Sequence, residues 1–309
     1  MSRTGTISLA AIFQAFLCGG QLNRTSAVLG ALRVTTSLAT VFLFVSFVSA
    51  QESVIQQDAD VSCPMGPLRT SSSNSRYFAD GCGNAVYLTG SHAHLSFKDG
   101  GRRPPGISPL DYDKYLDLME ANNHNFMRLW SGWELPFFEP QPWKRTGPEM
   151  ARDGKPKFDL AQFDESYFER LRDRVVAARE RNIYVSVMLF EGWLLRFIPG
   201  SAAQHPFHPT NNVNDINADT NDDGVIIEAH TLNNSAVTAI QEAYVRKVID
   251  TLNDLDNVLY EVINEGGEKE WNWWVIQTIQ EHQRGKPKQH PVGNTGHGAE
   301  RLATMLASP

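Results

Sequence analysis

The stretch Val258-Leu-Tyr-Glu-Val-Ile-Asn-Glu-Gly-Gly267 decides the fold of this chain of 309 residues. Residues 258–263 are mostly β-branched or aromatic and are bounded by turn formers, a pattern that predicts a short buried strand. Asn264 and Glu265 follow, so a carboxamide and a carboxylate stand where strand becomes loop. In a parallel barrel this edge carries the chemistry, because its loops vary while the strands hold the geometry. Polar residues that merely end a strand are the alternative.

The rest of the chain alternates between strand and helix. Further strands are predicted at residues 125–130, 182–190 and 290–296, and amphipathic helices at 108–119, 163–181, 236–252 and 270–283. Ahead of them, residues 76–90 predict a small hairpin with an Asp-Gly turn. Residues 136–158 and about forty residues after 193 are predicted as long loops. This order predicts an α/β fold with parallel strands and right-handed helical crossovers.

Alternation alone does not distinguish a barrel from an open, doubly wound sheet. No glycine-rich phosphate loop follows a predicted strand, which disfavours the nucleotide-binding form of the open sheet. No Gly-x-Ser-x-Gly motif is present either, which counts against an esterase of the α/β-hydrolase type.

Composition narrows the class of protein. Hydrophobic residues make up 41% of the chain and charged residues 20%, proportions that fit an ordinary globular protein. The net charge is −7 and no long run of lysine and arginine occurs, so neither nucleic acid nor an anionic membrane is the expected partner. An enzyme with a neutral substrate fits better, and the oligomeric state stays open.

The first 50 residues predict a secretory signal peptide or leader. Arg33 precedes the apolar run 34–50, which ends in Val48-Ser-Ala50, a sequence suited to signal cleavage. The run is too short and too rich in serine and threonine for a membrane span. Residues 51–75 are predicted as a linker and residues 76–309 as the main domain, in a secreted or periplasmic protein. Cleavage after Ala50 would leave Cys63 and Cys82, which form either a disulfide or two unrelated thiols.

Four motifs in order along the chain resemble a known group of enzymes. They are Val86-Tyr-Leu-Thr-Gly-Ser-His92, Asn125-Phe-Met-Arg-Leu-Trp130, Tyr184-Val-Ser-Val-Met-Leu-Phe-Glu-Gly-Trp193 and Asn257-Val-Leu-Tyr-Glu-Val-Ile-Asn-Glu265. Together they resemble the cellulase-like and apiosidase-like glycoside hydrolases of the retaining clan built on (β/α)8 barrels. The likeness covers residues 76–309. It implies a barrel of the TIM type that is incomplete, with about five of eight strand–helix units present.

The resemblance also implies roles for three residues. Glu265 would be the general acid and base, and Asn264 would hydrogen-bond the 2-hydroxyl of the sugar. Arg128 would orient a carboxylate, although a purely structural ion pair is the alternative. Other polar and aromatic residues follow strands and could line a sugar-binding cleft, or equally stabilise loops and fill core. These are His92, His94, Trp130, Trp133, Glu134, Glu191, Trp193, Asn294 and His297.

The chain departs from the family pattern at its carboxyl end. In the clan the nucleophilic carboxylate sits late, usually on the seventh strand, whereas the last predicted strand here is the fifth. We therefore expect little or no activity from the isolated chain and place the nucleophile beyond residue 309. A non-catalytic carbohydrate-binding protein of the same fold is the alternative function. It predicts sugar binding without turnover.

One acidic loop is a weak candidate for a calcium site, and no other cofactor is expected. Asp219, Asn221 and Asp223 fit the first half of a calcium loop, and a glycine follows Asp223. His230 stands where the loop's final glutamate belongs, so an ordinary solvated acidic turn is the alternative. No zinc-ligand spacing occurs, since His205 and His208 share a proline-containing loop without nearby cysteines.

Overall fold

A parallel sheet of four strands is the centre of the computed structural model, which describes residues 65–91, 93, 96–97, 110–131, 133–134, 139–197 and 200–295. The strands lie in the order β4 (Phe126–Trp130), β7 (Tyr184–Glu191), β8 (Val258–Asn264) and β9 (Val292–Thr295). Gly90, at the end of the hairpin predicted at residues 76–90, forms a parallel bridge with Phe126. The second strand of this hairpin therefore approaches the sheet beside β4. The register places Glu191 directly opposite Asn264, which brings two predicted site residues to one edge.

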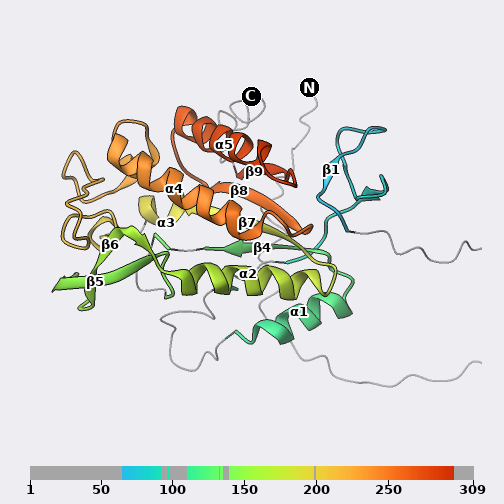
Figure 1. The fold of residues 1–309 in the computed structure, drawn as a ribbon, viewed down its shortest axis with the longest axis horizontal. Coiled ribbons are helices and arrows are strands. Elements are labelled where there is room, and N and C mark those ends of the chain that lie inside the picture. The colour runs from blue at the N-terminus through green and yellow to red at the C-terminus, as the bar shows by residue number, and fades with distance from the viewer. Residues whose placement is uncertain are drawn as a thin grey trace, which may run out of the picture. The chain divides into compact units, whose positions relative to one another are not determined.

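Helices alternate with these strands, as predicted. α1 (Tyr112–Ala121) precedes β4, α2 (Glu165–Arg179) precedes β7, α4 (Ser235–Leu252) precedes β8 and α5 (Lys269–Arg284) precedes β9. α2 packs on β7, α5 packs on β8 and β9, and α4 contacts both α2 and α5. Figure 1 shows α2, α4 and α5 as a layer in front of the sheet. The prediction of an α/β fold built from parallel strand–helix units is confirmed.

Local sequence explains where these helices begin. Asp111, Asp164 and Asn234 precede α1, α2 and α4, and each side chain accepts hydrogen bonds from backbone N–H groups of the first turn. α2 buries one stripe of side chains against the sheet and α4, and α4 buries another. All seven residues of β8 are buried, since the strand lies between two neighbours and under a helix.

The amino ends of the parallel strands are covered by a small antiparallel sheet. It consists of β1 (Arg69–Thr70), β2 (Phe78–Ala79) and β3 (Ala85–Val86). The pairing of β2 with β3 confirms the predicted hairpin, while β1 shows that part of the predicted linker belongs to the sheet. Leu68 packs with Tyr184 and Leu259 at the start of β7 and β8, which closes this end with apolar side chains.

Cys82 lies in the turn of this hairpin and is disulfide-bonded. Cys63 lies outside the described residues, as does the predicted signal peptide at residues 1–50. Of the helices that the structure describes, none is long and apolar enough to cross a membrane.

Two predicted loops have more structure than expected. Much of the segment 136–158 is not loop, because β5 (Trp143–Met150) pairs with β6 (Pro156–Phe163) in an antiparallel hairpin. The guanidinium of Arg145 stacks on Phe158 at 3.8 Å and forms an ion pair with Asp153. Neither contact can be predicted from a short-range sequence pattern. The segment after β7 contains α3 (Gly192–Phe197) and the short 3-10 helices η2 (Ala202–Gln204) and η3 (Ile227–His230).

Candidate active site

An arginine–glutamate pair lies at the centre of the face of the sheet away from the helices. Arg128 on β4 donates from Nε to Glu261 Oε2 on β8 at 2.8 Å, and its Nη2 contacts the other carboxyl oxygen. Ser186 on β7 donates to Glu261 Oε2 at 3.2 Å, and the hydroxyl of Thr295 on β9 contacts Oε1. Four parallel strands thus contribute to one polar cluster. Both oxygens of the buried carboxyl group have donors, as such a group requires.

Sequence reasoning missed Glu261. Arg128 was predicted to orient a carboxylate, and the carboxylate it contacts is this one, with only 8% of the Glu261 side chain exposed. A glutamate in the middle of an otherwise apolar strand was the available signal, because charged residues are rarely buried without a partner. The pair therefore fixes the register and orientation of β4 and β8 beneath the candidate site.

The side-chain amide of Asn264 forms hydrogen bonds through both its nitrogen and its oxygen. Its Nδ2 donates to Glu191 Oε1 at 2.9 Å, and its Oδ1 accepts from Arg128 Nη2 at 3.3 Å. These two contacts define which side of the amide faces which neighbour. Asn264 is therefore positioned by residues from β4 and β7 at the carboxyl edge of the sheet.

Glu191 is a buried carboxyl group in which only one of the two oxygens forms hydrogen bonds. Its Oε1 accepts from Asn264 and from the backbone N–H groups of Trp193 and Leu194, at 2.9 and 3.2 Å. Its Oε2 is buried and has no hydrogen-bond partner. Burial raises the pKa of Glu191 to about 7, although the hydrogen bond from Asn264 acts in the other direction. Close to neutral pH this group can hold or release a proton.

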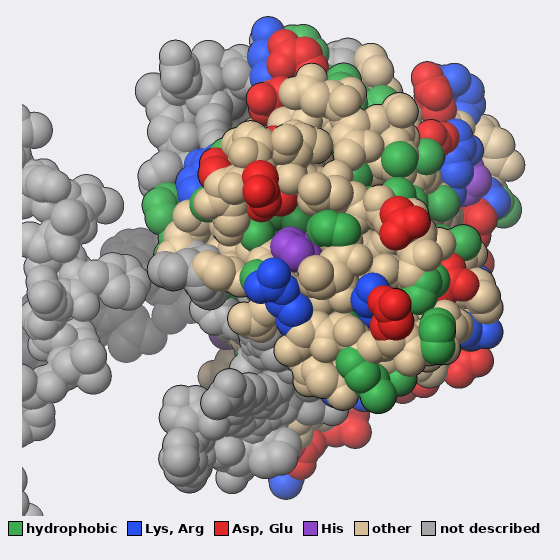
Figure 2. All heavy atoms as spheres, turned by 90° about the vertical axis from the view of Figure 1, so that its left-hand side faces the viewer, with side chains coloured by type: hydrophobic (Ala, Val, Ile, Leu, Met, Phe, Trp, Pro, Cys, Tyr) green, Lys and Arg blue, Asp and Glu red, His purple; other side chains and the backbone are tan. Residues whose placement is uncertain are grey.

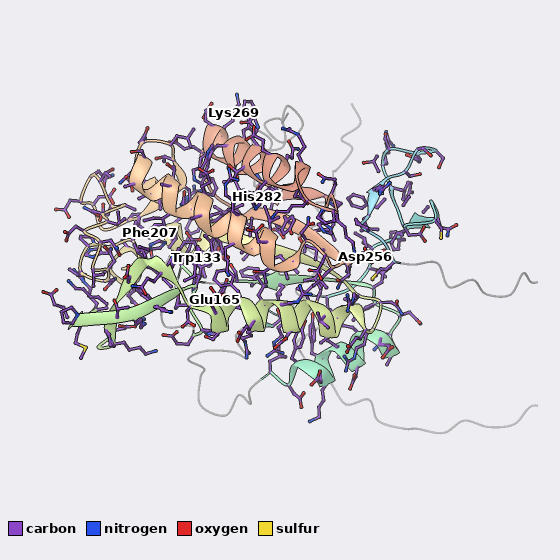
Figure 3. All side chains as sticks on the ribbon, in the orientation of Figure 1. Trp133, Glu165, Phe207, Asp256, Lys269 and His282 are labelled. Atoms are coloured by element: carbon purple, nitrogen blue, oxygen red, sulfur yellow. The ribbon has the colours of Figure 1, made fainter. Side chains whose placement is uncertain are left out.

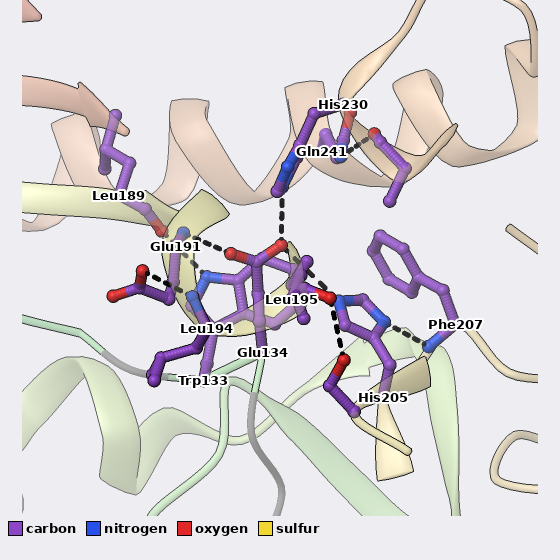
Figure 4. Close-up of polar contacts among 12 residues, drawn as sticks. Trp133, Glu134, Leu189, Glu191, Leu194, Leu195, His205, Phe207, His230 and Gln241 are labelled. Carbon is purple, nitrogen blue, oxygen red and sulfur yellow. Dashed lines mark hydrogen bonds and ion pairs between the residues drawn. The ribbon is translucent and has the colours of Figure 1, made fainter. Parts of the chain in front are cut away.

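Behind Glu191 lies a glutamate between two histidines (Figure 4). Glu134 Oε1 is 2.7 Å from Nε2 of His230 and 3.4 Å from Nε2 of His205, and its Oε2 accepts from the backbone N–H of Glu191. His205 Nδ1 accepts from the backbone N–H of Phe207, so its Nε2 carries the proton that faces Glu134. Burial acts to raise the pKa of Glu134, but attraction to His230 and hydrogen bonds from both histidines lower it to about 2.

This cluster, which we call the Glu134 triad, comprises Glu134, His205 and His230. All three side chains are 3% exposed or less, so of the two roles considered for Glu134, lining a cleft or stabilising a loop, the structure favours the second. Its role is to brace the backbone at Glu191. Sequence reasoning did not connect the two histidines to Glu134, because they lie 71 and 96 residues away from it along the chain.

Glu265 stands in a turn of unusual backbone conformation. Its φ is +52°, a left-handed conformation that costs a residue with a side chain about 1–3 kcal/mol and clusters at functional sites. The next residue, Gly266, lies so close to Gly192 that a Cβ atom on either glycine would collide with the other. The turn after β8 is therefore pressed against the turn after β7, which brings the segment carrying Glu265 next to the one carrying Glu191.

The predicted aromatic residues differ in their surroundings. Trp133 is fully buried and packs edge-on against Trp143, with ring centres 4.7 Å apart, so it fills core and offers no face to a sugar. Trp133 and Phe207, both labelled in Figure 3, are fully buried, and their ring centres are 5.5 Å apart. Trp130 is partly buried, with the guanidinium of Arg128 5.2 Å from its ring. Trp193 is 42% exposed at the start of α3.

Asn294 does not join the cluster. Asn294 on β9 donates to Asn272 of α5 at 2.9 Å, on the helix-covered side of the sheet. His92, His94 and His297 lie outside the described residues.

The acidic loop closes on itself rather than around an open site. Both carboxyl oxygens of Asp219 accept from backbone N–H groups, those of Asp223 and Gly224, at 3.2 and 3.0 Å. Asn221 donates to Asp223 and to Glu228. Within the described part of the chain, no group of three or more histidine, cysteine, aspartate or glutamate side chains could hold a metal ion. The calcium prediction therefore gains no support from the geometry.

A family model matches most of this framework. The model, described as "Domain of unknown function (DUF6298)", matches residues 112–296, from the start of α1 to just past β9. The chain belongs to this family. No curated protein matches the DUF6298 chain by sequence.

Several solved structures of similar fold are described as glycoside hydrolases. A protein from Bacteroides vulgatus ATCC 8482, provisionally assigned as a glycoside hydrolase, is 14% identical with a TM-score of 0.52 over 77% of the DUF6298 chain and 40% of its own. A family 5 mannosidase from Rhizomucor miehei is 16% identical, with a TM-score of 0.47 over 74% and 55% of the two chains. Endo-glycoceramidase II from Rhodococcus sp. is 16% identical, with a TM-score of 0.47 over 75% and 63%.

These likenesses concern the fold. The DUF6298 chain spans between 40% and 63% of the length of the three structures. A variant of the mannosidase is described in complex with mannosyl-fructose, and the glycoceramidase as a lactosyl-enzyme intermediate. The predicted likeness to barrel glycoside hydrolases is confirmed at the level of the fold.

Proposed function

We propose that this DUF6298 protein is a glycoside hydrolase that cleaves O-glycosyl bonds in an oligosaccharide or polysaccharide. Among such enzymes we place it nearest to the cellulase-like and apiosidase-like proteins whose motifs it resembles. The observation that carries the proposal is the edge of β8, where Asn264 is held from two sides and Glu265 follows in a left-handed turn. In a β/α barrel this is the edge at which catalytic groups stand.

Glu265 is the proposed general acid and base. Its protonated carboxyl group gives a proton to the glycosidic oxygen as the bond to the anomeric carbon breaks, so the leaving sugar departs as a neutral alcohol. The carboxylate that remains then takes a proton from the water that completes the reaction. Asn264, with its amide fixed by Arg128 and Glu191, is the proposed partner of the sugar 2-hydroxyl.

The reaction also needs a second carboxylate, which attacks the anomeric carbon or activates water there. The family resemblance assigns this role to a later barrel strand than β9. Glu191 and Glu261 are poor candidates, because their oxygens are buried and most are occupied by hydrogen bonds within the cluster. We assign these two residues to positioning Asn264 and Arg128.

We further propose that the protein acts outside the cytoplasm. The apolar run 34–50 has the pattern of a signal peptide, and the disulfide at Cys82 suits an oxidising compartment. Expression with the native leader, followed by fractionation, would place the protein outside the cytoplasm. Retention of the whole protein, leader included, in the cytoplasm would contradict this.

The function is tested by comparing wild type with Glu265→Gln in two assays, with both proteins prepared in a form that includes the later barrel strand to which the family resemblance assigns the second carboxylate. Reducing ends released from a panel of neutral oligosaccharides measure turnover, and calorimetry measures affinity for the same sugars. We expect the variant to lose about a thousandfold in kcat and to bind with little change. Glu270→Gln, an exposed glutamate of α5, is the matched control and should behave as wild type.

The alternative function gives a different result in the same experiment. A non-catalytic carbohydrate-binding protein would bind sugars without releasing reducing ends, and Glu265→Gln would change neither property. That pattern would overturn the glycosidase proposal.

A further inference from the structure

Glu191 joins two segments at the carboxyl edge of the sheet through a single oxygen atom. Its Oε1 accepts from Asn264 Nδ2 at the end of β8 at 2.9 Å, and from the backbone N–H groups of Trp193 and Leu194 in the first turn of α3 at 2.9 and 3.2 Å. The backbone N–H of Glu191 donates to Glu134, which fixes the residue from behind (Figure 4). The carboxyl group is therefore the link between a rigid strand end and a short helix.

The helix is the part of this link that can move. α3 has six residues, too few to be stable as a helix by itself. Trp193 and Phe197 of α3 are 42% and 59% exposed, so part of the helix surface faces water. β7 and β8, in contrast, are buried along their whole length. Loss of the hydrogen bonds to Glu191 would therefore loosen α3 and leave the strands in place.

The other oxygen of Glu191 decides which charge state the closed arrangement favours. Oε2 is buried and meets no hydrogen-bond donor among the described residues. Burial acts most strongly against the ionised form, the hydrogen bonds on Oε1 act in its favour, and the nearby charge of Glu134 adds to the effect of burial. The net result raises the pKa of Glu191 to about 7. With α3 in place, the carboxyl group therefore keeps its proton at pH values where a glutamate in water has lost it.

Charged and titratable groups belong to every element around Glu191. Glu134 is ionised at neutral pH, since its own pKa lies at about 2. Arg128 hydrogen-bonds the oxygen of Asn264 and pairs with Glu261, so its charge is already partnered. The other such groups are His205 and His230 on Glu134, Arg196 on α3 and Glu265 in the turn after β8. On the face that Figure 2 shows, acidic and basic side chains are interspersed, so this face imposes no field of one sign on the buried carboxyl group.

We propose that Glu191 makes α3 a pH-dependent clamp on the candidate active site, closed while the carboxyl group holds its proton and loosened when that proton leaves to water. Once α3 has moved, water can hydrate Oε2, so opening restores the ordinary pKa of the carboxyl group. Ionisation and opening therefore favour each other, and the clamp loosens as the pH rises from 4.5 through about 7. The clamp is a property of the fold, whereas its effect on turnover rests on the proposed function, in which it would limit the positioning of Asn264 to acidic and neutral pH.

Amide hydrogen exchange of Trp193 and Leu194, followed by NMR between pH 5 and pH 8, measures the opening of the clamp. Their protection factors, which correct for the intrinsic effect of pH on exchange, should fall about seventyfold over this range, given a pKa of about 7 in the closed form and 4.5 in the open form. Their protection should also stay below that of amides in the middle of α4, which exchange on global unfolding. Glu191→Gln cannot ionise and should remove the pH dependence, while Glu270→Gln, which changes an exposed glutamate of α5, should keep it.

Three results would overturn the inference. They are wild-type protection factors that do not change with pH, a pH dependence that persists in Glu191→Gln, and protection of the two α3 amides as strong as that of α4. Hydrolysis measured in parallel, in the form that includes the later barrel strand, separates the clamp from the proposed function. Turnover together with pH-independent protection rejects the clamp alone. Protection that depends on pH as expected, without turnover, rejects the glycosidase and keeps the clamp.

Discussion

Replacing Glu134 with glutamine should destabilise the protein in a way that depends on pH. Glu134 is buried against His230 and His205, and its pKa lies at about 2 instead of 4.5. At about 1.4 kcal/mol for each tenfold change in a protonation constant, this depression corresponds to about 3 kcal/mol of stability. The variant should lose about that much free energy of unfolding at pH 7, because the histidines lose a charged partner.

The sign of the pH dependence follows from the direction of the pKa change. A carboxyl group with a lowered pKa stabilises the fold above the unfolded value of 4.5, and this stabilisation is lost as the pH falls from 4.5 towards 2. Urea denaturation at pH 7, 5, 4 and 3.5 should show the difference in stability between wild type and Glu134→Gln narrowing from about 3 kcal/mol at pH 7 to about 2 kcal/mol at pH 3.5. Glu242→Gln, which removes an exposed ion pair with Arg246, should cost less than about 1 kcal/mol at every pH. A pH-independent gap between wild type and Glu134→Gln would refute the reasoning.

Two further changes test the geometry around the site. Asn264→Ala removes the hydrogen bond that lowers the pKa of Glu191, so the pKa of Glu191 should rise above about 7. Carbon NMR of the labelled carboxyl group measures this pKa. An unchanged value would contradict the assigned contact between Asn264 and Glu191. Gly192→Ala should destabilise the protein by about 2 kcal/mol, because the new Cβ meets the backbone of Gly266. Gly285→Ala is the control, since the space around Gly285 is open, and it should change the free energy of unfolding by less than about 1 kcal/mol. Urea denaturation measures both effects. Equal effects of the two glycine substitutions would show that the turns after β7 and β8 are not in close contact.

The elements that local pattern determines could be predicted from the sequence. β8 is an apolar run between turn formers, and α2 and α4 follow capping residues with apolar residues at helical spacing. The position of Asn264 and Glu265 at the carboxyl edge followed from the parallel arrangement, because parallel strands end at one edge.

Contacts between distant segments could not be predicted in the same way. Arg128 and Glu261 are 133 residues apart in the chain and meet only because β4, β7 and β8 are neighbours. The β5–β6 hairpin lies in a segment with several prolines and polar residues, where short-range signals favour a loop. Trp133 is an aromatic residue of the kind on which sugar rings stack, but other side chains surround it completely, so it is part of the hydrophobic core.

The dependence of catalysis on the leaving group tests the role of Glu265 most directly. A general acid is needed for a poor leaving group such as a sugar alcohol, but hardly at all for an activated nitrophenol. Glu265→Gln should therefore slow hydrolysis of oligosaccharides about a thousandfold, while release of nitrophenol from the matching aryl glycoside in single turnover changes little. Equal slowing of both substrates, or unchanged hydrolysis of oligosaccharides, would contradict the account.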